Sequence, residues 1–326
     1  MKKNITGSWF EFRHHSPAEG KYWNDTCRTF TAEQWHKKVA EIATLKMKYL
    51  VLMNTAIVYD DDEYCYFDTD IFPFADMECK DPIGELLSAA DEYGIKVFIS
   101  CGFYGNWKKP ADNMKSDAVC ERAFRAMKEL WEKYGSHTSF YGWYFPDETC
   151  IIGHFGKSFV KYVNAYSAEA QRIAPGTKTL IAPFGTKLAI TGRKYVRQLK
   201  EMNVDFIAYQ DEVGVKKSSP KQTARYFKRL KKAHDKAGKS KIWADIELFT
   251  FEGAVYRSAL IPAPAERIEK QIEAVSPYVE EILCYQYMGL LNEPGSDAFC
   301  GHPDSVKLYG EMRKRADDTV QNRRKG

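Results

Sequence analysis

Short apolar stretches alternate with amphipathic stretches along the whole chain. The apolar stretches are rich in aromatic and β-branched residues, which is typical of strands buried on both faces of a parallel sheet. The amphipathic stretches place apolar residues three and four positions apart, which is typical of helices that cover such a sheet. The pattern predicts strands at 5–12, 49–58, 95–103, 141–148, 177–184, 204–209, 241–246 and 281–287.

Capping residues mark the ends of the predicted helices. Thr31 and Gln34 have the spacing of a capping box, Pro82 suits the first turn of a helix, and Gly94 and Gly238 suit helix ends. These signals and the periodicity predict helices at 31–46, 82–92, 117–134, 158–173, 191–202, 220–237, 264–276 and 304–315.

Eight strand–helix units in succession predict an α/β protein with a parallel sheet, and eight repeats favour a single (β/α)8 TIM barrel. The 326 residues contain no linker-like stretch and no break in composition, so we expect one domain over residues 1–326. An open doubly wound sheet is the alternative, but it usually has a glycine-rich turn after its first strand, and none is present here. We expect the loops 11–32 and 59–82 to form part of the rim of the site, and the tail 316–326 to be disordered.

Composition limits the possible partners. The net charge of +4 is small and spread along the chain, which argues against nucleic acid. No apolar run approaches the ~20 residues needed to cross a membrane. The eight cysteines include no C-x-x-C pair, which favours reduced thiols. With no apolar signal region before residue 5, we expect a cytoplasmic protein as the sequence stands, and a periplasmic or secreted one if a signal peptide was removed. The sequence does not indicate an oligomeric state.

The ends of the predicted strands carry aromatic, amide and carboxyl side chains. In a TIM barrel the carboxyl ends of the strands form the functional site. Aromatic rings stack on the C–H faces of sugars, and amide and carboxylate groups form hydrogen bonds with their hydroxyls, so this set predicts a carbohydrate partner. Phosphate would require converging basic residues and glycine-rich turns. The residues expected to contact the sugar are Glu11, His14, Asn54, Tyr104, Trp107, Gln210, Asp211 and Tyr287.

Glu148 and Glu247 lie at the ends of the predicted fourth and seventh strands. Glycoside hydrolysis needs one protonated carboxyl group for the leaving oxygen and one ionised carboxylate that attacks the anomeric carbon or activates water. Each residue could instead be a solvated strand-end acid, but two of them at an aromatic rim favour a catalytic pair. Gln210 and Asp211 could also orient Glu247, and Asp211 could cap a helix. We expect Asp245, one layer lower in the barrel, to be structural.

His14 and His15 are candidate metal ligands. Barrel metallohydrolases, however, collect histidines from several strand ends, and of the other five histidines only His154 follows a predicted strand closely enough to join them. We therefore expect no metal and no cofactor, and a sugar contact from one of the two histidines. The acidic run 60–63 lacks the spacing of an EF-hand loop.

A Glu at the end of the fourth strand and another at the end of the seventh resembles the pattern of clan A glycoside hydrolases. The resemblance implies that Glu148 is the acid/base, that Glu247 is the nucleophile, and that configuration is retained. Asp147 departs from the pattern, because the clan usually has an Asn there that holds a sugar hydroxyl. Asp147 would hold the hydroxyl as an acceptor, or would itself be the acid. Gln286 and Tyr287 stand where the clan usually has a Trp on strand eight.

Four stretches resemble more closely a bacterial family of glycosidase-like barrels catalogued as domain of unknown function 4434. They are 5–10, 140–148, 209–214 and 243–249, and the resemblance covers nearly the whole chain. It implies a glycosidase-like barrel without specifying a substrate. Our leading hypothesis is a retaining glycoside hydrolase that acts on an unidentified glycan without a cofactor. The alternatives are a non-catalytic carbohydrate-binding barrel and a metal-dependent hydrolase.

Overall fold

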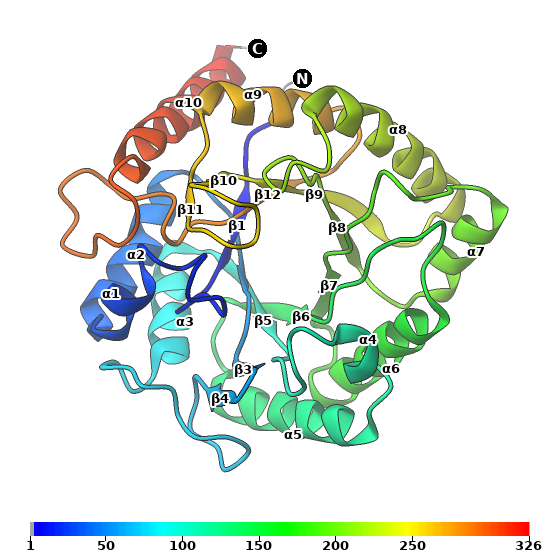
Figure 1. Ribbon diagram of the computed structural model, residues 1–326, viewed down its shortest axis with the longest axis horizontal. Coiled ribbons are helices and arrows are strands. Elements are labelled where there is room, and N and C mark those ends of the chain that lie inside the picture. Colours follow the sequence, from blue (N-terminus) through cyan, green and yellow to red (C-terminus); the bar gives the residue numbers. More distant parts are fainter. Residues whose placement is uncertain (1–2, 326) are drawn as a thin grey trace.

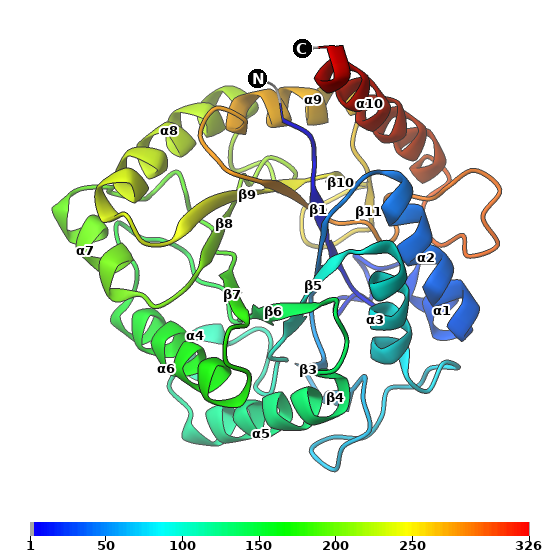
Figure 2. The same ribbon diagram turned by 180° about the vertical axis from the view of Figure 1, so that it is seen from behind.

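Eight parallel strands close into a barrel in the computed structural model, which describes residues 3–325 (Figures 1 and 2). The strands neighbour one another in the order β1-β12-β9-β8-β7-β6-β5-β2, and the last pairs with the first. The predicted (β/α)8 TIM barrel is therefore confirmed. The barrel strands are β1 (Gly7–Phe10), β2 (Tyr49–Leu52), β5 (Lys96–Ser100), β6 (Phe140–Tyr144), β7 (Lys178–Ile181), β8 (Phe206–Gln210), β9 (Lys241–Glu247) and β12 (Ile282–Tyr285).

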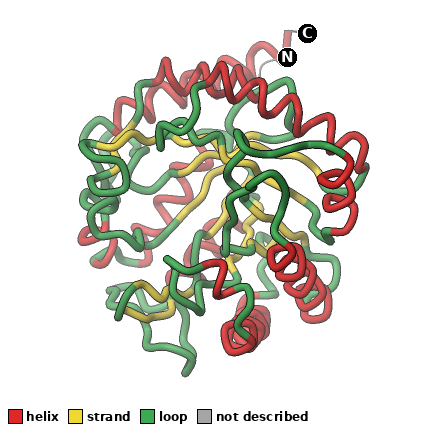
Figure 3. The backbone as a smooth tube through the Cα atoms, turned by 45° about the vertical axis from the view of Figure 1, so that its right-hand side comes forward, coloured by secondary structure: helices red, strands yellow, loops and turns green. Residues whose placement is uncertain are grey.

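The helices form a ring outside the strands, as Figure 3 shows. Several helices begin or end at the residues that the sequence marks. Thr31 and Gln34 form a capping box at a helix N-terminus, and Gly94 and Gly238 take left-handed backbone angles at helix C-termini. The helices are α1 (Asn24–Arg28), α2 (Ala32–Thr44), α3 (Pro82–Tyr93), α4 (Pro110–Asn113), α5 (Asp117–Tyr134), α6 (Lys157–Ile173), α7 (Arg193–Glu201), α8 (Pro220–Ala237), α9 (Ala265–Val275) and α10 (Ser305–Lys325).

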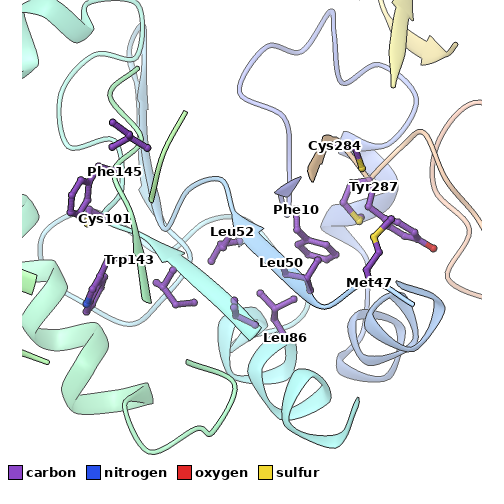
Figure 4. Packing of buried hydrophobic residues seen from close by; sticks show 14 of the residues in the cluster. Phe10, Met47, Leu50, Leu52, Leu86, Cys101, Trp143, Phe145, Cys284 and Tyr287 are labelled. Atoms are coloured by element: carbon purple, nitrogen blue, oxygen red, sulfur yellow. The ribbon is translucent and has the colours of Figure 1, made fainter. Parts of the chain in front are cut away.

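Side chains along the barrel strands alternate between two hydrophobic clusters. The inner cluster takes at least one residue from every barrel strand, including Tyr144 and Trp243, and it fills the barrel. The outer cluster takes the alternate residues, such as Trp143, and packs them against the helices. Figure 4 shows part of the outer cluster, where Leu50 of β2 lies near Leu86 of α3. Because successive side chains of a strand point to opposite faces, this alternation decides which carboxyl groups at the strand ends face the barrel axis.

Two short hairpins add walls at the carboxyl end of the barrel. The hairpin of β3 (Ala56–Tyr59) and β4 (Asp62–Cys65) follows β2, and the hairpin of β10 (Phe249–Phe251) and β11 (Leu260–Pro262) follows β9. The stretch that we predicted as one strand from 49 to 58 is thus divided between the barrel and the first hairpin.

Two other predicted boundaries differ from the structure. Strand β6 ends at Tyr144, so Glu148 lies in the loop beyond the strand rather than at its last position. Helix α10 continues to Lys325, where we expected a disordered tail, because the sequence from 311 to 325 contains neither Gly nor Pro to end a helix. The last residue of that predicted tail, Gly326, lies outside the described residues.

None of the described helices is both long enough and apolar enough to cross a membrane. All eight cysteines are free thiols, and six of them are buried. They contribute to the packing of the core as small apolar side chains.

Candidate active site

A cavity of about 250 Å³ opens at the carboxyl end of the barrel. Its lining includes residues at or beyond the end of every barrel strand, as the TIM-barrel fold leads one to expect. Its polar lining consists of His14, His15, Glu19, Glu148, Gln210, Glu212, Lys217, Asp245 and Glu247. Its apolar and aromatic lining consists of Met53, Trp107, Phe184, Val215, Phe249, Phe251, Tyr256, Leu260 and Tyr285.

Glu148 is held in the cavity by two hydrogen bonds. Its Oε1 accepts the Tyr144 hydroxyl at 2.8 Å, and its Oε2 accepts the side-chain amide of Gln210 at 2.6 Å. Burial raises the pKa of Glu148 to about 7, although both hydrogen bonds favour the ionised form and lower it. A half-buried carboxyl group with a pKa near neutrality can both give and take a proton.

Glu247 is the last residue of β9 and is buried. Its Oε2 accepts the backbone N–H of Val215 at 2.9 Å. Burial, with a smaller contribution from the nearby Asp211 carboxyl group, raises the pKa of Glu247 to about 8. Asp245, two residues earlier on the same face, interacts electrostatically with both Glu148 and Glu247, and burial raises its pKa well above the ordinary value.

Polar groups beneath Glu247 hold the end of β9 in place. Asp211 Oδ1 accepts the backbone N–H of Glu247 at 3.2 Å, and Asp211 Oδ2 accepts the Gln271 amide at 2.6 Å. The Arg267 guanidinium donates to the carbonyl oxygens of Glu247 and Phe249, both at 2.7 Å. Helix α9, which carries Arg267 and Gln271, therefore supports the strand end that presents Glu247.

Loop residues after β1 form a second polar group beside the cavity. Glu11 is completely buried, and its Oε1 accepts the amide of Gln286 at 2.6 Å and the indole N–H of Trp23 at 3.2 Å. Burial raises the pKa of Glu11 to about 8. His14 and His15 stack at 4.2 Å between ring centroids, and burial lowers the pKa of both rings.

The structure brings together seven of the residues that the sequence singles out. The residues that line the cavity are His14, His15, Trp107, Glu148, Gln210, Asp245 and Glu247.

The other predicted residues lie outside the lining of the cavity. Asp211 lies beneath Glu247, and Glu11 lies beside the cavity, as described above. Asp147, in the loop after β6, accepts the Asn113 amide at 3.0 Å. Tyr287 donates to the buried Glu41 at 2.6 Å.

Asn54 and Tyr104 are also buried outside the cavity lining. The ring of Tyr104 stacks on Phe72 at 5.8 Å between centroids.

Several lining residues were missed in the sequence. The hairpin after β9 contributes Phe249, Phe251 and Leu260, and the turn between its strands contributes Tyr256. The alternating aromatic residues at 249 and 251 are the signal that could have revealed this hairpin. Lys217 follows β8, and its ammonium group lies over the rings of Phe184 and Tyr256.

The fold and the cavity define a class of protein: TIM barrels that gather carboxyl groups at the carboxyl ends of their strands. Within that class, the chain belongs to the family described as domain of unknown function (DUF4434), whose model matches residues 5–298. The resemblance expected from the sequence is confirmed. A search of curated proteins finds no match.

Several solved glycoside hydrolases share the fold. A crystal structure described as a candidate α-L-fucosidase from Bacteroides thetaiotaomicron has a TM-score of 0.73 at 16% identity, over 96% of this chain and 93% of that chain. An endo-1,4-β-mannanase from Rhizomucor miehei has a TM-score of 0.59 at 10% identity, over 97% and 95%. A β-galactosidase from Halorubrum lacusprofundi has a TM-score of 0.61 at 11% identity, over 96% of this chain but 58% of that enzyme. At such identities the likeness shows the fold alone.

Proposed function

We propose that the protein is a glycoside hydrolase that uses Glu148 as acid/base and Glu247 as nucleophile. The observation that carries the proposal is the environment of Glu148. It lies in a cavity with aromatic walls, between a phenol and an amide, with a pKa of about 7. The similarity of the fold to solved glycoside hydrolases supports the same activity.

In the proposed first step, Glu148 gives its proton to the glycosidic oxygen. The bond between that oxygen and the anomeric carbon breaks, and its electron pair leaves with the oxygen. The carboxylate of Glu247, which must be ionised for this step although burial raises its pKa to about 8, forms a bond to the anomeric carbon from the other side. In the second step Glu148 takes a proton from a water molecule, whose oxygen displaces Glu247 with a second inversion, so configuration is retained.

The aromatic lining supports a sugar ring as the substrate. Trp107 stands on one side of the cavity lining, after β5, and Phe249 and Phe251 stand on the other, after β9. Their faces can cover the C–H surfaces of a pyranose, while Gln210 and Lys217 are available to its hydroxyls.

Two single variants test the proposal on a panel of aryl α-L-fucosides, β-galactosides and β-mannosides. Glu148→Gln and Glu247→Gln should each lower turnover by at least about three orders of magnitude, because each removes a group that reacts directly. Glu252→Gln, a change of the same kind on the exposed part of the hairpin, is the matched control. NMR of the first product formed should show the anomer of the substrate. Full activity in either of the first two variants would remove that residue from the mechanism.

A further inference from the structure

Glu11, His14 and His15 form a compact cluster that the proposed hydrolysis does not use. One possible ligand atom from each residue lies within 4.8 Å of those from the other two. All three side chains are buried, with 0%, 3% and 8% of their surfaces exposed. The short loop that follows β1 thus gathers one carboxyl group and two imidazole rings at one point beside the cavity.

The hydrogen bonds at hydrogen-bond distance to Glu11 all lie on one oxygen. Trp23 and Gln286 both donate to Oε1, and the Tyr285 side chain interacts with the same carboxyl group, whereas Oε2 has no partner at hydrogen-bond distance among the described residues. Among the residues that the structure describes, Glu11 forms no ion pair with Lys or Arg. A buried carboxylate is strongly disfavoured unless it is paired with a cation or binds a metal. The geometry leaves Oε2 available for such a cation.

His14 is oriented by the surrounding loop. Its backbone N–H and C=O both bond to the side chain of Asn24, at 2.7 and 2.9 Å. Its Nδ1 accepts the backbone N–H of Ser16 at 3.0 Å and lies 3.2 Å from the carbonyl oxygen of Ser16. In this arrangement Nε2 carries the hydrogen of the neutral ring. Metal binding at Nε2 would move that hydrogen to Nδ1, from which it could be donated to the Ser16 carbonyl. The Nε2 atom lies 3.9 Å from a carboxylate oxygen of Glu19, another residue of the cavity lining.

His15 is fixed by its neighbours on both faces. Its ring lies between His14, at 4.2 Å, and Trp107, at 3.7 Å between centroids. Its Nδ1 is buried without a hydrogen-bond partner in the described structure. Each of the two imidazoles places one possible ligand atom in the cluster.

We propose that Glu11, His14 and His15 bind one divalent transition-metal ion such as Zn²⁺. Two imidazoles and a carboxylate suit this class of ion. Ligand atoms of a tetrahedral zinc site lie about 3.3 Å apart, so small side-chain rotations would close the cluster around the ion. His14, His15 and Glu19 all line the cavity, so an ion held here would lie at its wall, and Glu19 can supply a fourth ligand. The sequence argued against a metal because its two candidate histidines follow the same strand. In the structure the loop after β1 supplies all three ligands of the cluster, so no histidine from another strand end is needed.

Metal binding tests this site independently of hydrolysis. The purified chain is freed of metal with a chelator, and Zn²⁺ or Co²⁺ binding is measured by calorimetry and by elemental analysis after dialysis. We expect one ion per chain. Glu11→Gln keeps an acceptor for Trp23, and His15→Phe keeps the ring stacked on Trp107, so both variants are expected to fold. Each should weaken zinc affinity by at least about 100-fold, because removal of a ligand costs no less than removal of its outer partner.

Two controls separate this cluster from other metal-binding groups. His36→Ala removes a histidine that pairs with Glu92 away from the cavity, and it should leave affinity unchanged. Cys27→Ser removes a buried thiol close to Cys300, and it too should leave affinity unchanged. With Co²⁺ we expect only weak visible bands, since thiolate ligands would add an intense near-ultraviolet band.

Three results would overturn the proposal. They are no binding by the wild-type chain at saturating zinc, unchanged affinity in folded Glu11→Gln and His15→Phe chains, and a thiolate band that disappears in Cys27→Ser. An anomalous-scattering peak between Glu11 and the two imidazoles would support it directly. A chain that binds zinc here and hydrolyses no glycoside would leave this site standing while the proposed function fails.

Discussion

Replacing Glu247 by Gln should stabilise the folded protein, and the gain should grow with pH. Glu247 is 5% exposed, and burial raises its pKa from 4.5 to about 8. Because the folded-state pKa is raised, the stability associated with the protonated group is fully present below the unfolded pKa. It is lost as the pH rises through about 8, where the folded protein must ionise a buried group. Gln has the same shape and no charge, so the variant avoids this loss.

The size of the effect follows from the pKa difference. One pKa unit corresponds to about 1.4 kcal/mol. Between about pH 5 and about pH 8, the difference in unfolding free energy between Glu247→Gln and the wild type should therefore grow by about 3.5 kcal/mol. This is a measurable part of the ~5–15 kcal/mol that stabilises a typical domain.

Urea unfolding at both pH values, followed by tryptophan fluorescence in the presence of a thiol reductant, measures this difference. Taking the difference between variant and wild type cancels the other groups that titrate in the same range. Glu252→Gln is the control, because Glu252 is exposed and its contacts with Tyr22 and Lys21 lower its pKa, so no growth is expected. A gain for Glu247→Gln that stays constant between the two pH values would refute the reasoning. Glu247 would then be ionised in the folded protein throughout the range.

Two further predictions concern the pair of carboxyl groups and its support. The reactive form needs Glu148 protonated and Glu247 ionised. With pKa values of about 7 and about 8, kcat/KM should follow a bell-shaped pH profile that peaks between about 7 and 8, and a maximum near pH 5 would contradict these pKa values. Arg267→Met removes donors to two backbone carbonyls and should cost about 2–4 kcal/mol in urea unfolding. It should also move the alkaline limb to higher pH, because the Arg267 charge lowers the pKa of Glu247. Arg267→Lys, which keeps the charge, should restore the limb, and a limb that stays shifted in it would exclude the electrostatic explanation.

Much of the fold follows from local signals in the chain. The alternation of apolar and amphipathic stretches predicted eight strand–helix units. As expected, Thr31 caps the start of a helix, and Gly94 and Gly238 cap helix ends. These signals act over a few residues, so they can be read without the tertiary structure. Boundaries that depend on packing were less well predicted. Glu148, for example, lies in a loop four residues beyond the end of β6.

The candidate site divides in the same way. Strand-end position alone pointed to Glu148 and Glu247, because every parallel strand of a barrel delivers its carboxyl end to one rim. The direction of a loop side chain depends on contacts with distant segments of the chain. Such contacts hold several of the other predicted site residues outside the cavity. Asp147 turns toward Asn113, and Tyr287 turns toward Glu41. Neither contact can be predicted from the residues that flank Asp147 or Tyr287 in the sequence.

The sequence by itself determined the class of fold, the rim and the carboxyl groups that strands four and seven deliver to it. Only the tertiary structure decided the electrostatics. Burial, which raises the pKa of Glu148 and Glu247, is a property of the surrounding segments and not of the residues that flank each carboxyl group. The same is true of the metal cluster proposed at Glu11, where Gln286 from the other end of the chain holds the carboxyl group in place. Periodicity reports which face of an element is buried, whereas charge and proton affinity depend on everything packed against it.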